Sequence, residues 1–266
     1  MKTPKRDLSI SEIVQQEEIL LAIKQYLPDI NNLLNTSRKL KDLKKKYYYW
    51  RLNSNSSRKY VSNRQFGMKI DARLVNTKTQ MSLNLRNCLG FSDASALGNM
   101  HRLNLSRCSN ISDVSMLGEV TVLDLSDCRA VRDVSNLGDV TILNLSKCTG
   151  IIDVSNLGKV LSLNLGGCTS IHDVRALGNI KTLDLSCCPN IQDVTCLGGV
   201  HTLNLSRCSG IADVSALGKV HTLDLGDCKR ITDVSQLGAV INLNLWGCQG
   251  VTDVSALSKV PNLNLP

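Results

Sequence analysis

Residues 200–219 have the sequence VHTLNLSRCSGIADVSALGK, and residues 220–239 have the sequence VHTLDLGDCKRITDVSQLGA. The same pattern recurs every 20 residues from Met81 onward, in nine full copies and a tenth that stops at Pro266. A strict period of this length indicates a solenoid, in which each copy forms one coil and buries its apolar side against the neighbouring coils. The repeat therefore predicts nine coils and a terminal strand in residues 81–266.

Each copy divides into a strand and a tight turn. Apolar and polar residues alternate from Val120 to Leu125, which is the pattern of a half-buried strand. Apolar residues then recur at every third position, at Val131, Val134 and Leu137, which favours a tight turn or a single 3₁₀ turn over a full helix. Seven apolar positions in a copy cannot form a core alone, so the coils must stack to be stable.

A cysteine follows the strand pattern in every copy. The nine are Cys88, Cys108, Cys128, Cys148, Cys168, Cys188, Cys208, Cys228 and Cys248. A small side chain with a weak S–H donor fits a buried turn and can donate to a backbone carbonyl. The 20-residue spacing contains no CxxC pair. We therefore interpret these cysteines as packing residues rather than as metal ligands or redox groups.

An aspartate and a glycine also recur once in each copy. The aspartates, from Asp93 to Asp253, precede a turn and are predicted to cap it by accepting backbone N–H groups. A calcium ladder is the alternative, but the GGxGxDxUx motif of calcium-binding solenoids is absent. The glycines, from Gly98 to Gly238, are predicted to supply a positive-φ bend before each strand. Ser258 replaces the glycine in the ninth copy and Pro261 follows, which predicts an edge strand that discourages further stacking.

The VxxLxLxxC and DVSxLG motifs resemble the cysteine-containing leucine-rich repeats. The resemblance covers residues 81–266 and implies a curved, right-handed solenoid with one parallel strand per coil on its concave side. Because copies of 20 residues are shorter than most repeats of this class, we expect 3₁₀ or turn segments, and no true helices, on the convex side. In such solenoids the outward strand residues face a partner.

Residues 1–80 differ from the repeats in charge. They contain 17 Lys and Arg against 7 Asp and Glu, whereas residues 81–266 contain 14 against 16. Apolar residues at helical spacing predict a helical domain at residues 1–52, and residues 53–80 fit a basic linker or N-terminal capping segment. The run Lys44–Tyr49 mixes cations with aromatic rings, as nucleic-acid-binding segments do. No RNP, KH or zinc-finger pattern accompanies it, so we favour a protein partner over nucleic acid.

The order EILLAIxxYLPDIxNLLNTSxxLxDL…YWRL in the first 52 residues is similar to an F-box. The resemblance implies a small all-α domain that binds a Skp1-like adaptor and thereby recruits a target to a Skp1-cullin-type ubiquitin ligase. Val14-Gln15 or their neighbours stand where the family usually has a Leu-Pro pair. The alternative is that these helices only cap the first coil. The adaptor-binding residues that the resemblance implies are Ile19, Leu20, Ile23, Leu27, Pro28, Leu33, Leu34, Leu40 and Trp50.

Candidate contacts for an unknown protein target lie on the predicted concave face. Trp246 is of the residue type that anchors interfaces, although it equally fits a lid over the last coil. His201 and His221 are predicted on adjacent strands, and without a third ligand we interpret them as surface histidines rather than as a metal site. We expect no metal and no cofactor. The full candidate set is His101, Arg102, Asp124, Lys181, His201, His221 and Trp246.

Several function classes are disfavoured by what the sequence lacks. It shows no constellation of nucleophile, base and orienting group and no phosphate loop, so we expect no enzyme activity. It shows no apolar run long enough for a membrane span and no secretory signal. With 11 cysteines, this predicts free thiols and an intracellular protein of the cytoplasm or nucleus. The first hypothesis is an F-box-type substrate receptor, the second is a general protein-binding scaffold, and the third is a surface adhesin, which the missing signal disfavours.

Overall fold

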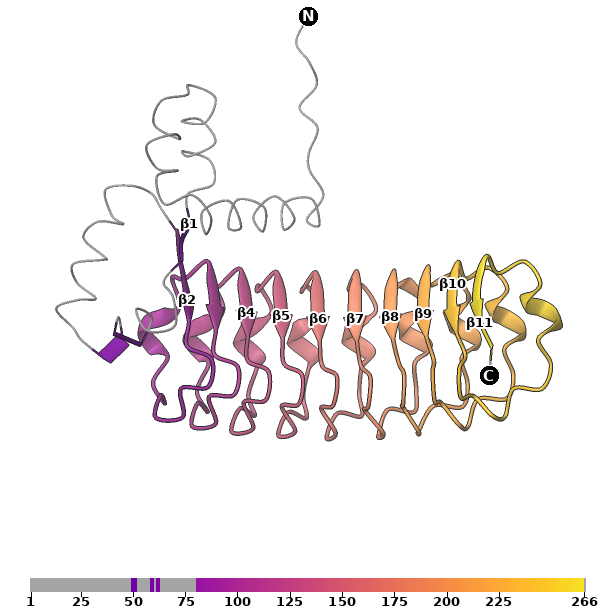
Figure 1. Ribbon diagram of the computed structural model, residues 1–266, viewed down its shortest axis with the longest axis horizontal. Helices are drawn as coiled ribbons and strands as arrows, with labels where there is room; N and C mark the ends of the chain where they lie inside the picture. Colours follow the sequence, from indigo (N-terminus) through magenta and orange to yellow (C-terminus); the bar gives the residue numbers. More distant parts are fainter. Residues whose placement is uncertain (1–48, 52–57, 60, 63–79, 266) are drawn as a thin grey trace, which may run out of the picture. The chain divides into compact units, whose positions relative to one another are not determined.

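The computed structural model describes residues 49–51, 58–59, 61–62 and 80–265. The chain divides into two compact units, Met1–Tyr48 and Tyr49–Pro266, and the second unit contains the repeats (Figure 1). The predicted helices of residues 1–48 lie outside the described residues. The same holds for every predicted adaptor-binding residue except Trp50.

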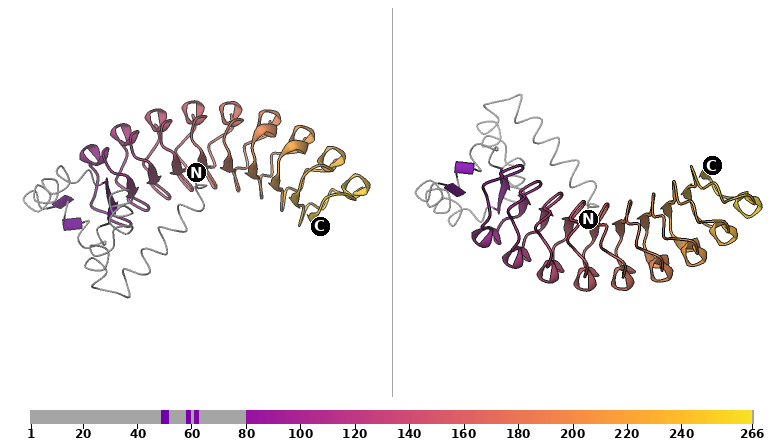
Figure 2. Two further views of the ribbon diagram at one scale, coloured as in Figure 1. Left: turned by 90° about the horizontal axis from the view of Figure 1, so that it is seen from above. Right: turned by 90° about the horizontal axis from the view of Figure 1, so that it is seen from below.

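The ten strands of the repeats and strand β1, which precedes them, form a parallel sheet of 11 strands whose order in space follows the chain. From β2 onward, neighbouring strands pair in a 20-residue register, so that Leu123 lies beside Leu143 and Leu143 beside Leu163. The strands line the inner side of an arc formed by the coils (Figure 2). This confirms the predicted leucine-rich-repeat architecture. The strands are β1 (Tyr49–Arg51), β2 (Gln80–Asn84), β3 (Arg102–Asn104), β4 (Val122–Asp124), β5 (Ile142–Asn144), β6 (Ser162–Asn164), β7 (Thr182–Asp184), β8 (Thr202–Asn204), β9 (Thr222–Asp224), β10 (Asn242–Asn244) and β11 (Asn262–Asn264).

Each coil places one 3₁₀ segment on the outer, convex side of the arc (Figure 2). Seven of the nine span three residues, which confirms the expectation of single turns in place of helices. The segments are η1 (Ser95–Leu97), η2 (Ser115–Leu117), η3 (Ser135–Leu137), η4 (Ser155–Leu157), η5 (Arg175–Leu177), η6 (Thr195–Gly199), η7 (Ser215–Lys219), η8 (Ser235–Leu237) and η9 (Ser255–Leu257).

The core consists of the seven predicted apolar positions, stacked from coil to coil. In the coil that contains β4, the side chains that point inward are all at most 2% exposed. The equivalent residues of the last coil are less covered, and Val254 and Leu263 are only half-buried. Stacking therefore buries each coil on both sides except at the end of the array. The inward residues of the β4 coil are Leu123, Leu125, Cys128, Val131, Val134, Leu137 and Val140.

The cysteines form a buried ladder along the core, as predicted. Each thiol from Cys108 to Cys248 donates to the carbonyl oxygen of the leucine 23 residues earlier, at S···O distances of 3.0–3.3 Å. The acceptor thus lies in the preceding coil and not in the same turn. Cys88 is half-buried and instead accepts a hydrogen bond from Arg58 Nε at 3.1 Å. The cysteine therefore ties consecutive coils together as well as filling space.

The recurring aspartates cap the 3₁₀ segments, which confirms their predicted role. Each Oδ1 from Asp93 to Asp253 accepts the backbone N–H two residues ahead, at 2.8–3.0 Å. These N–H groups stabilise the charged carboxylate and lower the pKa of Asp113, Asp133 and Asp153, for example.

The glycine prediction was wrong in its mechanism. Gly98 and Gly138 have φ values of −62° and −64°, in the right-handed region. At all eight positions from Gly98 to Gly238, an added Cβ would lie less than 3.0 Å from a carbonyl oxygen of the next coil. Glycine is therefore required by close packing between coils. The positive-φ bend is seven residues into each copy, where seven non-glycine residues including Lys147 adopt φ of 56–62°.

The border of the head is also corrected by the structure. Tyr49–Arg51, which we expected to close the helical domain, forms strand β1, with Trp50 paired to Met81 in the ladder. Tyrosine and tryptophan favour strands, and the free edge of β2 offers a ladder of backbone groups. The second unit therefore begins at Tyr49 and not after residue 52.

Candidate functional site

The candidate contacts belong to separate rows that run across the strands. His101, Lys181, His201 and His221 occupy the position just before the strand, where Lys181 and the last two are exposed and His101 is half-buried. Arg102 is the first residue of β3, and Asp124 is the last residue of β4. Trp246 lies two residues beyond the end of β10. The structure therefore brings His201, His221 and Lys181 into one row and leaves Trp246 at the opposite ends of the strands.

Asp124 belongs to a row whose main role is structural. Its Oδ1 accepts the backbone N–H of Ser126 at 3.0 Å and holds the bend that follows the strand. Asn144 and Asp184 make the same bond to the N–H two residues ahead, at 3.0 and 2.9 Å. Asparagine and aspartate both occur in this row because both carry the required Oδ1 acceptor. From the sequence we expected Asp124 to be a partner contact and missed its role in the bend.

Trp246 is exposed, with 57% of its surface accessible, so it does not act as a buried lid. The same position in the preceding coil is Gly226, which leaves the indole without a side chain beside it on that strand. The backbone of Trp246 is held by Asn244 Oδ1, which accepts its N–H at 3.1 Å. A large aromatic side chain on a fixed backbone suits an interface anchor.

His201 and His221 form a stacked pair at the start of β8 and β9. Their ring centroids are 4.6 Å apart, and the ring planes differ by 12°. Nδ1 of each ring lies 3.2 Å from the hydroxyl of the threonine that follows it, Thr202 or Thr222. Among the described residues, no group of three or more His, Cys, Asp or Glu side chains could hold a metal ion.

His101 differs from the exposed pair. Burial, with a smaller contribution from the charge of Arg102, lowers its pKa to about 4. The ring is therefore neutral at physiological pH and does not provide a charged contact. The sequence could not distinguish His101 from His201, because both precede a strand in the same way.

A row of ion pairs after the strands escaped the sequence analysis. Arg207 Nε lies 3.3 Å from Asp227 Oδ2, and Arg107 Nε lies 4.0 Å from Asp127 Oδ2. These residues occupy the left-handed position of consecutive coils. Exposed pairs of this kind contribute about 0–1 kcal/mol to stability, so their main effect is to neutralise this edge of the concave face.

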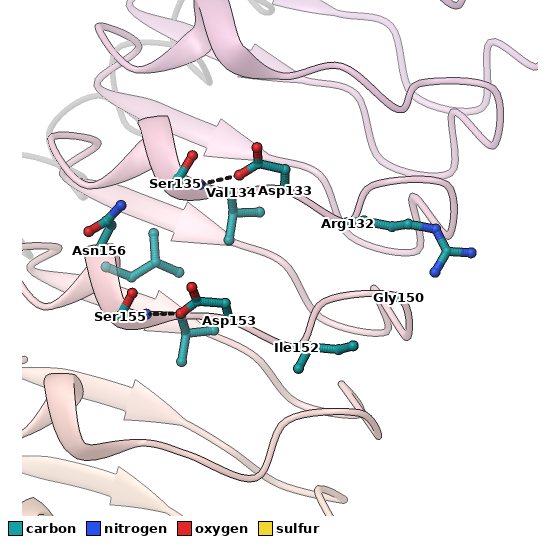
Figure 3. Close-up of a pocket in the computed structure, with 11 residues that line it drawn as sticks. Arg132, Asp133, Val134, Ser135, Gly150, Ile152, Asp153, Ser155 and Asn156 are labelled. Carbon is teal, nitrogen blue, oxygen red and sulfur yellow. Dashed lines mark hydrogen bonds between the residues drawn. The ribbon is translucent and has the colours of Figure 1, made fainter.

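The convex side carries shallow hollows between coils. One is lined by Arg132, Gly150 and Ile152 together with Asp133 and Asp153 (Figure 3). Both carboxylates are directed to the backbone N–H groups of their own turns, as the dashed lines show. The hollow thus contains the capping groups of two adjacent coils. Among the described residues, no helix is long and apolar enough to cross a membrane.

The sequence matches no protein-family model and no curated protein. Among solved structures, an internalin C2 of Listeria monocytogenes is similar at 28% identity, with a TM-score of 0.43, over 56% of this chain and 71% of that protein. An internalin F of the same organism matches at 19% identity and a TM-score of 0.39, over 69% and 70% of the two chains. A domain of its InlJ protein described as including a cysteine ladder matches at 18% and 0.27, over 70% and 56%.

Proposed function

We propose that this chain is a non-catalytic protein-binding scaffold whose concave sheet holds a protein partner. The observation that carries the proposal is the sheet itself, whose outward side chains are not used by the core. The outward side chains at and just before the start of each strand change in charge and size from coil to coil, as at Arg102, Val122 and Thr182, while the inward positions stay apolar and buried. A rigid concave surface of this kind presents many contacts without the entropy cost of ordering loops.

A second feature supports an intracellular place for the protein. All 11 cysteines are free thiols, and the eight buried ones donate their S–H to backbone carbonyls within the core. Thiols persist in reducing compartments. We therefore infer the cytoplasm or nucleus in preference to the cell surface that the adhesin hypothesis requires.

Site-directed crosslinking tests the scaffold proposal. A photo-reactive amino acid at Thr182, which is exposed on β7, is compared with one at Ala256, which is exposed on η9 of the convex side. We expect a protein adduct from position 182 and none from position 256, and a weaker adduct when Trp246→Ala is added. Equal adducts from the two positions would contradict a concave binding face.

The finer proposal assigns the head to a Skp1-like adaptor, which makes the chain an F-box-type substrate receptor of a ubiquitin ligase. It rests on the motif similarity in residues 1–52, and the ligase chemistry belongs to the partner proteins. A pulldown of the full chain with a Skp1-type protein tests it, with Leu20→Glu/Ile23→Glu as the disrupted variant. Binding lost in this variant while the repeats stay folded supports the adaptor role. Absence of binding by the intact chain leaves the general scaffold.

A further inference from the structure

Three consecutive coils carry a hydrogen-bond donor just before the strand. The pairs Lys181-Thr182, His201-Thr202 and His221-Thr222 lie at the starts of β7, β8 and β9, and we call Lys181, His201 and His221 the donor row. All three of these side chains are exposed. Their Cα atoms repeat with the strand spacing of about 4.8 Å. The three preceding coils have no nitrogen donor in the side chain at this position, where they carry Thr121, Thr141 and Leu161.

A chain of hydrogen bonds sets the direction of the His221 donor. Asn262 Nδ2 donates to Asn242 Oδ1 at 2.7 Å, and Asn242 Nδ2 donates to Thr222 Oγ1 at 3.0 Å. If Thr222 donates its hydroxyl proton to His221 Nδ1, 3.2 Å away, the ring accepts at that nitrogen. A neutral imidazole that accepts at Nδ1 carries its proton on Nε2. In that arrangement Nε2 of His221 is a hydrogen-bond donor.

This arrangement disfavours a cation and favours an anion. A metal ion needs the lone pair of a ring nitrogen, and in this arrangement the lone pair of Nδ1 is occupied and Nε2 carries a proton. The ammonium group of Lys181, on the neighbouring coil, adds a positive charge to the same row. Donors aligned in this way suit carboxylate oxygens.

We propose that the donor row is a subsite for the carboxylates of an acidic segment in the protein partner. The row contains no carboxylate of its own. Asp184 and Asp224 lie about 10 Å further along their strands. Their Oδ1 atoms are occupied by the N–H groups of Ser186 and Gly226, both at 2.9 Å. An acidic side chain at the donor row therefore meets positive charge without facing these aspartates directly.

The first test determines the tautomer of His221 in the full chain. Long-range ¹⁵N–¹H NMR of the imidazole nitrogens distinguishes a proton on Nε2 from one on Nδ1. We expect the Nε2–H form in the wild type and a mixture of tautomers in Thr222→Val, which removes the hydroxyl. A predominant Nδ1–H form in the wild type would overturn the relay and with it the proposal.

The second test measures binding of octa-glutamate to the full chain, with octa-glutamine as the neutral probe and inorganic phosphate as a small anion. The variant Lys181→Gln/His221→Phe removes two donors and keeps an aromatic ring at position 221, beside His201. Lys159→Gln is the matched control, because it removes an exposed charge from the bend after η4. Two exposed charge-assisted contacts predict an affinity loss of about three- to tenfold in the double variant, and none in the control.

Three results would overturn the proposal. The first is an equal loss of octa-glutamate affinity in the double variant and in the control. The second is an equal affinity of the wild type for octa-glutamine. The third is a change of the His221 NMR signals on adding phosphate but not on adding octa-glutamate. The proposal rests on the concave binding face, yet the two fail separately. If position 182 gives adducts but the donor-row variant binds octa-glutamate as the wild type does, the scaffold proposal is retained and the acidic segment is rejected.

Discussion

The convex and concave sides of the solenoid follow different rules. On the convex side, the backbones of adjacent coils nearly touch, and Gly178 lies against the carbonyl of Cys196 in the next coil. On the concave side, the strands are held by their ladder and the outward side chains leave into solvent. The glycine of the convex side is therefore nearly constant, whereas the outward residues at the start of the strands are free to vary. The comparison separates residues that build coils from residues that can serve a partner.

The largest expected effect comes from filling the convex contact. Gly178→Ala places a Cβ against the backbone oxygen of Cys196, which cannot move as a flexible side chain can. We expect a loss of about 1–3 kcal/mol in unfolding free energy, measured by urea denaturation. Gly90→Ala is the matched control, because a Cβ there meets nothing within 4 Å. If both variants lost equal stability, close packing would not explain the glycine row.

A related effect is expected at the last coil, where Ser258 replaces the glycine. Pro261 lacks an N–H, but the equivalent N–H of Ile241 donates backwards, to the His221 carbonyl at 3.1 Å. The proline therefore leaves the outer edge of β11 unchanged, and the Cβ of Ser258 is the steric obstacle to another coil. We expect a copy of residues 247–266, appended after Pro266, to raise the urea midpoint more in Ser258→Gly than in the wild-type background. An equal rise in both backgrounds would show that Ser258 is no obstacle.

The cysteine ladder is expected to contribute a moderate amount per residue. Cys168→Ala removes the thiol that donates to the Leu145 carbonyl at 3.1 Å and should cost about 0.5–1.5 kcal/mol in unfolding free energy. Cys187→Ala changes an exposed thiol and should leave the denaturation midpoint unchanged. Burial also raises the pKa of Cys128 to about 12, so native-state labelling at pH 8 should modify Cys187 long before Cys128. Equal labelling rates would contradict a buried ladder.

The smallest effect concerns pH and the aspartate caps. Turn N–H groups lower the pKa of Asp133, Asp153 and Asp213 in the folded chain. A lowered folded pKa contributes stability that is fully present above the unfolded value of about 3.9 and is lost as the pH falls through the folded value. We expect the thermal midpoint to fall between pH 5 and pH 2, and less steeply when these three residues are changed to Asn. Asp139→Asn serves as the control, and an equal change in slope would show that the caps carry no pH dependence.

Much of the fold could be predicted because each position of the repeat recurs in nine copies, so its apolar or polar character is evident from the sequence. The strand at Val122, the turn near Leu137 and the buried Cys128 all follow from apolar spacing in a single copy. The reason for the glycine row could not be predicted, because it depends on a carbonyl 18 residues away that approaches only when the coils stack. Strand β1 was missed for a similar reason, since its pairing partner is supplied by the edge of β2.

For the candidate site, the residue types were evident and their grouping was not. His101, His201 and His221 share one position of the repeat, yet the first is half-buried with a lowered pKa and the other two are exposed and stacked. Asp124 was taken for a partner contact, whereas its Oδ1 holds a bend. Neighbouring coils determine the first outcome, whereas the Asp124 bond is made within its own coil.

By itself the sequence determined the number of coils, the residues that point inward and the division between a basic head and a neutral array, because each is a property of local spacing or charge. Only the tertiary structure decided how coils approach each other, which atoms the thiols and glycines meet, and which side chains are linked by hydrogen bonds beside His221. These depend on groups that lie about 20 residues apart in the chain and become neighbours only when the coils stack.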